Sequence, residues 1–173
     1  KNFHKYENYR NLYASKKKLG GGVVLTQIHE IDYMLFILEG FEIKRIVSDT
    51  QKVSNLDIDV EDISSSVLRF ENKKKEKIIC ILHINYLEIP RKRKIEILFE
   101  KAKVVADLVK QEILIFKGEK SQISKKFKYA RNELFIKEIQ YFLKSVRNKK
   151  KVNKIYGIDN AIKSLKLAIK IKS

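Results

Sequence analysis

The sequence of 173 residues has one cysteine, one proline, six glycines and no tryptophan. A single cysteine, Cys80, cannot form an intramolecular disulfide, which excludes a small scaffold held together by disulfides. No group of Cys and His residues has the spacing of a zinc site. Polar residues interrupt the apolar stretch at 23–38, so no segment reaches the ~20 apolar residues of a transmembrane helix. We therefore expect no metal site and no membrane partner.

Acidic residues are few in relation to basic ones, with 21 Asp and Glu against 38 Lys and Arg, and the net charge is +17. Such an excess is typical of proteins that bind nucleic acid or another anionic surface. Only seven of the 38 cations are arginines, however, whereas recognition of phosphate and guanine favours arginine. The compositional drift of AT-rich genomes toward lysine gives the same excess without any binding role. The net charge therefore does not favour a nucleic-acid partner.

Hydrophobic residues make up 44% of the chain, enough for one domain with a sizeable core. Apolar residues recur at 3.6-residue spacing after the three glycines at 20–22 and predict a helix over 23–39. From residue 41 to 117 the period changes to two, which is typical of strands joined by short turns. The predicted strands lie at about 42–53, 62–71, 77–87, 92–100, 104–108 and 112–116, and two further helices at 132–148 and 160–171.

Short connections between the successive strands imply antiparallel pairing. In the fourth strand, Ile95 and Ile97 point away from Lys94, which indicates a sheet with one buried face. We therefore predict an α+β fold, an open antiparallel β-sheet of about six strands with helices packed on one face. The other face carries Ile79 and Ile81, and we expect it to pair with a copy of the chain or with another domain.

Among the residues that can carry chemistry, His29 lies on the predicted helix at 23–39, one turn after the glycines. Asp32 follows three residues later on the same face, where a carboxylate can orient or charge the imidazole. This arrangement suits a general acid or base presented at a cleft. A structural histidine bonded to its helical neighbour is the alternative, and for His83, on a strand, a packing or surface role is the simpler interpretation.

The string LGGGVVLTQIHEIDY at 19–33, with Gly40 beyond it, resembles the signature helix of the Gfo/Idh/MocA family, named for glucose-fructose oxidoreductase, inositol dehydrogenase and a rhizopine-catabolism protein. Upstream, Glu7-Asn8-Tyr9-Arg10 followed by Tyr13 is similar to an E-D-Y-R-x-x-Y segment of one branch of that family. The resemblance extends over nearly the whole chain, and further matches in the family's order lie at 60–62, 68–72, 85–87, 91–96, 107, 132–135 and 157–159.

The resemblance implies a two-domain enzyme whose N-terminal Rossmann domain binds NAD or NADP. Residues 1–173 would then form only the C-terminal domain, which binds substrate and forms oligomers. His29 matches the family's histidine that moves a proton beside a lysine of an E-K-P motif in the cofactor domain. That motif has no counterpart here, so we expect the isolated chain to be inactive.

The reaction implied is hydride transfer between the nicotinamide and a hydroxyl or carbonyl of a sugar or nucleotide-sugar, in a cytoplasmic homo-oligomer joined through the open sheet. One departure concerns substrate and reaction, because Leu25 stands where sugar dehydrogenases of the family often have Asp. The expected substrate contacts are Tyr9, Arg10, Asp32, Tyr86 and Arg93.

Two other functions are alternatives to this one. The first is a non-catalytic basic module that binds nucleic acid, for which Tyr9 and Tyr13 near the lysines at 16–18 are weak support. The second is a domain that serves assembly alone.

Overall fold

The structure is a computed structural model, and it describes residues 8–118, 120–130, 132–149, 153 and 157–173. Contacts between residues divide the chain into two compact units. Unit 1 comprises Lys1–Leu87 and Asn153–Ser173, and unit 2 comprises Glu88–Val152. Each unit is described by itself below.

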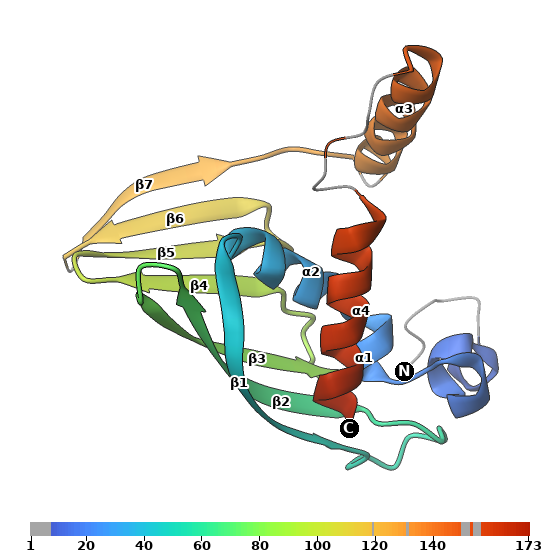
Figure 1. Ribbon diagram of the computed structural model, residues 1–173. Helices are drawn as coiled ribbons and strands as arrows, with labels where there is room; N and C mark the ends of the chain where they lie inside the picture. The colour runs from blue at the N-terminus through green and yellow to red at the C-terminus, as the bar shows by residue number, and fades with distance from the viewer. Residues whose placement is uncertain (1–7, 119, 131, 150–152, 154–156) are drawn as a thin grey trace. The chain divides into compact units, whose positions relative to one another are not determined.

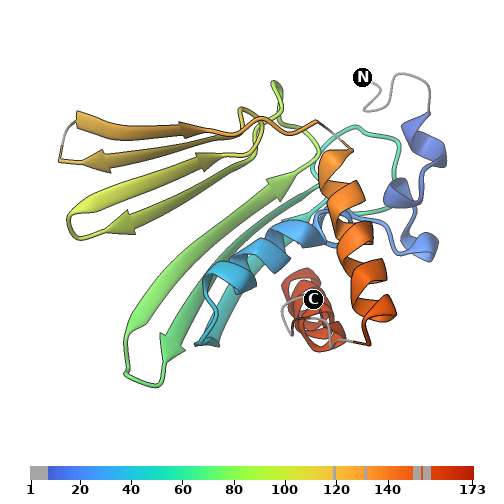
Figure 2. The same cartoon turned by 90° about the horizontal axis from the view of Figure 1, so that it is seen from above.

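Unit 1 contains a three-stranded antiparallel sheet with one face covered by helices (Figures 1 and 2). The strands are β1 (Phe41–Gln51), β2 (Ile63–Asn72) and β3 (Lys77–Asn85), in the order β1-β2-β3. The covering helices are α1 (Val23–Thr26), α2 (Ile28–Ile37) and α4 (Ile158–Lys172). Three 3-10 turns precede them, η1 (Tyr9–Asn11), η2 (Tyr13–Ser15) and η3 (Lys17–Leu19).

The core of unit 1 lies between the sheet and these helices. Burial alternates along β2, where every second side chain from Ser64 to Phe70 is buried and the residues between them are not. This period of two arises because successive strand side chains point to opposite faces. The buried hydrophobic cluster consists of Val23, Val24, Ile31, Met34, Leu68, Phe70, Ile84, Leu167, Ala168 and Ile171.

The helix predicted over 23–39 is divided at Gln27 into α1 and α2. Thr26 ends the short helix α1, and its hydroxyl bonds to the carbonyl oxygen of Gly22 at 2.7 Å. A threonine that bonds back to the carbonyl four residues earlier bends a helix. The Thr26 hydroxyl also contacts the hydroxyl of Tyr86, just beyond β3, so the break is held by a residue 60 positions away.

Unit 2 contains a second antiparallel sheet and helix α3 (Glu133–Arg147). Its strands β4 (Lys94–Phe99), β5 (Ala102–Asp107), β6 (Glu112–Lys117) and β7 (Lys120–Lys126) pair in sequence order. Ion pairs join adjacent strands on one face, Glu96 with Lys103 at 2.7 Å and Lys94 with Asp107 at 4.0 Å. Among the residues that the structure describes, no helix is long and apolar enough to cross a bilayer.

The predicted α+β class with antiparallel pairing is confirmed, and six strands and three helical segments lie near their predicted positions. The predicted antiparallel sheet of about six strands differs from the structure in one respect, because its seven strands form two sheets, of three and four strands. Strand β7, with the sequence KSQISKK, was not predicted because it has only one large apolar residue. Its strand conformation comes from pairing with β6, across a register irregularity between Ile115 and Phe116.

The glycine loop before α1 is packed too tightly for side chains. A Cβ on Gly21 would lie 2.5 Å from the carbonyl oxygen of Tyr13, and one on Gly22 would overlap the carboxylate of Glu61. Oε2 of Glu61 lies 3.0 Å from Nζ of Lys172. The same Nζ atom donates to the carbonyl oxygen of Gly21 at 3.0 Å. The loop therefore joins the end of α4 to the segment that precedes β2.

Gly22→Ala should lower the free energy of unfolding by about 2 kcal/mol or more, because the residue has a φ of +109° and its new methyl group would displace Glu61 from Lys172. Chemical denaturation measures this. Gly20→Asn is the matched control, since Gly20 has a φ of +77° but nothing within 4 Å, and asparagine tolerates that backbone conformation. An equal loss in both variants would contradict the role given to the Glu61 contact.

Candidate functional site

His29 lies in the first turn of α2 with 43% of its side chain exposed. Its Nε2 atom is 3.0 Å from Oε1 of Glu30, the next residue, whose side chain is only 17% exposed. The imidazole also meets the ring of Tyr33 edge to face, with 6.4 Å between the ring centres. The structure therefore presents an imidazole that is open to solvent and held by a carboxylate, an arrangement able to take up and return a proton.

The carboxylate beside His29 is not the one that helical spacing indicated. Asp32 accepts a hydrogen bond of 2.7 Å from the hydroxyl of Ser164, on α4. Because α4 packs along α2, it offers this donor to Asp32, while the neighbouring Glu30 reaches the imidazole. The expected His29–Asp32 pair is therefore replaced by a His29–Glu30 pair.

Tyr86, just after β3, joins the two segments on either side of the glycine loop. Its hydroxyl contacts the hydroxyl of Thr26, three residues before His29, and donates to the carbonyl oxygen of Ala14 at 3.4 Å. Burial raises the pKa of Tyr86 to about 12, and the hydrogen bond with Thr26 only partly offsets this effect. The phenol therefore stays protonated at neutral pH and already has protein partners, while its expected contact with substrate stays a prediction.

Tyr9 and Arg10 lie together in η1, and both contact the loop between β1 and β2. Nε of Arg10 is 2.7 Å from Oδ2 of Asp57, and its guanidinium lies 4.9 Å from the centre of the Tyr9 ring. The Tyr9 hydroxyl accepts a hydrogen bond of 3.3 Å from the backbone N–H of Asp57. These residues form one local cluster in unit 1, and Glu7, which begins the same sequence motif, lies outside the described residues.

Arg93 belongs to unit 2, immediately before β4, where its carbonyl oxygen accepts a hydrogen bond of 2.9 Å from the backbone N–H of Leu108. The other four expected substrate contacts lie in unit 1 with His29. Asp32 lies on the same helix as His29. Tyr86 contacts Thr26, at the end of the preceding helix α1.

Unit 1 also contains a cavity of about 250 Å³ that sequence reasoning missed. Its lining has three lysines and two carboxylates but does not include His29, and consists of Lys17, Thr50, Lys52, Asp59, Val60, Glu61 and Lys172. These residues come from four separate stretches of the chain, so no local pattern could have identified them. In the described residues, no three His, Cys, Asp or Glu side chains come together as a metal site.

The glycine loop offers no phosphate cradle in this structure. The backbone N–H of Gly21 donates to Lys16, that of Gly22 to Ala14 and that of Val23 to Glu61, each to a carbonyl oxygen at 3.0 Å. These three amides, which could otherwise bind a pyrophosphate, are therefore already used. The residues of this loop do not fit a nicotinamide dinucleotide.

Comparison with protein families matches residues 2–105 to the model of the GFO/IDH/MocA C-terminal domain. No curated protein sequence matches the chain.

Several solved structures share the fold at low sequence identity. UDP-N-acetylglucosamine 3-dehydrogenase GnnA from Acidithiobacillus ferrooxidans has a TM-score of 0.66 and 16% identity, over 87% of this chain and 46% of its own. The WlbA dehydrogenase from Chromobacterium violaceum, solved with NADH and UDP-GlcNAcA, has a TM-score of 0.55 and 18% identity, over 87% and 43%. Biliverdin reductase from Synechocystis, solved with biliverdin and NADP+, has a TM-score of 0.69 and 8% identity, over 93% and 48%. The chain thus spans about half the length of these proteins.

Tyr86→Phe should lower the stability of unit 1 at pH 8 by about 1 kcal/mol, because it removes the hydrogen bonds of the buried hydroxyl. Between pH 10 and about 12 the unfolded phenol ionises and the folded one does not, so the native chain loses stability there while the variant does not. The difference in the free energy of unfolding between the native chain and Tyr86→Phe should therefore narrow as pH rises. Denaturation at pH 8 and pH 11 measures it, with Tyr13→Phe, an exposed tyrosine, as the control. A difference that stays constant would contradict this assignment.

Proposed function

The chain belongs to the GFO/IDH/MocA family through its C-terminal domain, and from this premise we propose that it is the substrate-binding part of an NAD(P)-dependent oxidoreductase. The observation that carries the proposal is the partly exposed imidazole of His29, held by Glu30 at the start of α2. The dehydrogenases with the same fold, GnnA and WlbA, support this class of reaction.

In this proposal His29 moves a proton to or from the reacting hydroxyl of the substrate. An imidazole suits that step because it takes up and releases protons near neutral pH. Glu30 lies beside this ring, with its Oε1 atom 3.0 Å from Nε2. Asp32 acts differently, because its bond with Ser164 fixes α2 against α4 and thereby fixes the helix that carries His29.

The cofactor supplies hydride chemistry, and we propose that it binds to a domain other than this one. The bonded amides of the glycine loop support this division. A catalytic lysine would come from the same domain, so the chain alone should not turn over. For the substrate we propose a sugar or nucleotide-sugar, by analogy with GnnA and WlbA, with Tyr9, Arg10, Asp32, Tyr86 and Arg93 as the predicted contacts.

In the full-length enzyme, His29→Ala should lower kcat by roughly 10²-fold, the usual effect of losing a general acid or base, and leave cofactor affinity unchanged. Steady-state kinetics and cofactor titration measure the two quantities. Lys74→Ala, in the exposed turn between β2 and β3, is the control and should retain full activity. Turnover of His29→Ala near that of the control would assign His29 a structural role.

We also propose that the open face of the unit 1 sheet joins two copies of the chain. This face, opposite the helices, carries Val47, Val67 and Ile81 side by side in the strand register, with Ile79 on the same edge strand. Ile79 is 71% exposed and Ile81 is 75% exposed. A contiguous apolar patch of this kind is typical of an interface, and two-fold pairing buries the same patch on both copies.

Ile81→Asp should lower the weight-average mass of the chain in light scattering, because it places a charge in the buried centre of that interface. Leu98→Asp makes the same change at a residue of unit 2 that is 77% exposed, and should leave the mass unchanged. Added salt should strengthen the native association, since it screens the repulsion between two chains of charge +17. Equal masses for native and Ile81→Asp chains would refute the sheet interface.

A further inference from the structure

The cavity in unit 1 is lined by charged groups of both signs. Lys17 belongs to η3, Lys52 follows β1, Asp59 and Glu61 precede β2, and Lys172 ends α4. All of these residues belong to unit 1, so the cavity is defined within one compact unit. Its volume of about 250 Å³ lies below the ~300 to 1,000 Å³ of pockets that hold drug-sized ligands, which indicates a compact ligand.

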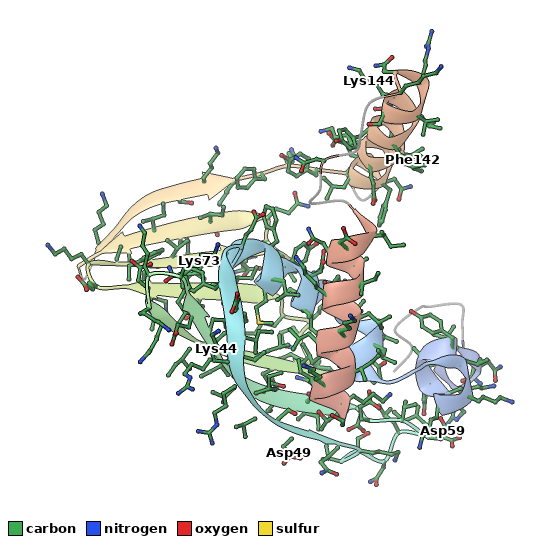
Figure 3. All side chains as sticks on the ribbon, in the orientation of Figure 1. Lys44, Asp49, Asp59, Lys73, Phe142 and Lys144 are labelled. Atoms are coloured by element: carbon green, nitrogen blue, oxygen red, sulfur yellow. The ribbon has the colours of Figure 1, made fainter. Side chains whose placement is uncertain are left out.

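Both carboxylates of the lining are held by other parts of unit 1. Oδ1 of Asp59 accepts a hydrogen bond of 2.6 Å from the backbone N–H of Lys17. The backbone N–H of Asp59 donates to the carbonyl oxygen of Ser15 at 3.3 Å, so this residue lies beside the 3-10 turns (Figure 3). Oε2 of Glu61 pairs with Nζ of Lys172 at 3.0 Å. The cavity therefore has two negative groups in fixed positions.

The second oxygen of Glu61 lacks a hydrogen-bond donor. The side chain is only 10% exposed, and Oε1 is buried. Among the residues that the structure describes, none donates a hydrogen bond to this atom. A buried carboxylate oxygen without a donor is unfavourable, and buried polar atoms of native proteins are normally satisfied. Because Glu61 lines the cavity, a molecule that fills the cavity can supply this donor.

Two lysines of the lining bring positive charge that no carboxylate neutralises directly. Nζ of Lys52 donates to the carbonyl oxygen of Ser54 at 2.9 Å. In the described part of the chain, neither this atom nor Nζ of Lys17 forms an ion pair with a carboxylate. An ammonium group with unused N–H donors attracts an anionic group of a ligand.

This mixture of charges discriminates between classes of ligand. Phosphate or another multiply charged anion would meet the carboxylates of Asp59 and Glu61, and like charges at short range repel each other. A simple cation would meet the three lysines. A ligand with one group of each sign meets opposite charges at both ends. The α-amino acids are compact molecules with this pattern, and the limited volume of the cavity favours a small side chain.

We propose that this cavity is a binding site for a small α-amino acid. Its ammonium group donates to Oε1 of Glu61 and pairs with Asp59, and its carboxylate pairs with Lys17 and Lys52. His29 is not part of the lining, so this site is distinct from the proposed oxidoreductase site and does not depend on that function.

Calorimetric titration of the full chain with alanine tests the proposal. Alanine should bind with a Kd of about 1 mM or tighter. Propionate lacks the ammonium group and ethylamine lacks the carboxylate, so each should bind at least about 10-fold more weakly. No binding of alanine at ten times that concentration would overturn the proposal. Equal binding of alanine and propionate, or binding of inorganic phosphate without alanine, would show a site for anions only and would also overturn it.

Variants of the lysines place the binding in this cavity. Lys17→Ala and Lys52→Ala should each weaken alanine binding about 10-fold, because each removes a charged partner of the carboxylate. Both side chains are exposed, so the fold should tolerate these changes, and circular dichroism checks it. Lys74→Ala is the matched control, since it removes the same charge from the exposed turn between β2 and β3. Equal effects of Lys52→Ala and Lys74→Ala would contradict the assignment.

The orientation of the amino acid is tested at the other end of the cavity. Asp59→Asn keeps an oxygen that can accept the N–H of Lys17 but removes the charge that faces the ammonium group. It should weaken alanine binding about 10-fold and leave the weaker binding of propionate unchanged. An equal loss for alanine and propionate would contradict the placement of the ammonium group.

Discussion

The arrangement of unit 1 depends on the contact between the glycine loop, Glu61 and Lys172. A side chain on Gly21 or Gly22 would clash with the carbonyl oxygen of Tyr13 or with the carboxylate of Glu61. Lys172 bonds to both Glu61 and Gly21. Three distant parts of the chain meet there, so the start of α1 and the end of α4 are fixed together. A side chain in this loop would separate them.

The position of His29 follows from that junction. The loop fixes α1, the Thr26–Tyr86 contact holds the break after it, and α2 then begins with His29 in its first turn. The bond between Asp32 and Ser164 keeps α2 against α4, which leaves Glu30 as the carboxylate beside the imidazole. Of the residues that type and spacing single out as chemical, the imidazole of His29 is open to solvent. Asp32 and Tyr86 bond to other parts of unit 1 and thereby position the helix that carries it.

The protein buries one face of its first sheet thoroughly and leaves other apolar surfaces open. The outer face of that sheet carries Ile79 and Ile81, both largely exposed, and an exposed apolar patch of this kind is typical of an interface. The chain spans about half the length of proteins that share its fold. In the proposed sheet interface, apolar burial would have to exceed the repulsion between two strongly basic chains.

The sequence by itself determined the α+β class, six of the strands and the helical segments, because periodicity records which side chains face a core. The string at 19–33 also identified the family and singled out His29. Tertiary structure alone decided the break at Gln27, the division into two sheets, strand β7 and the exchange of Asp32 for Glu30. Each of these depends on a partner far along the chain, such as Tyr86 for Thr26, strand β6 for β7 or Ser164 for Asp32, and a local pattern carries no record of such a partner.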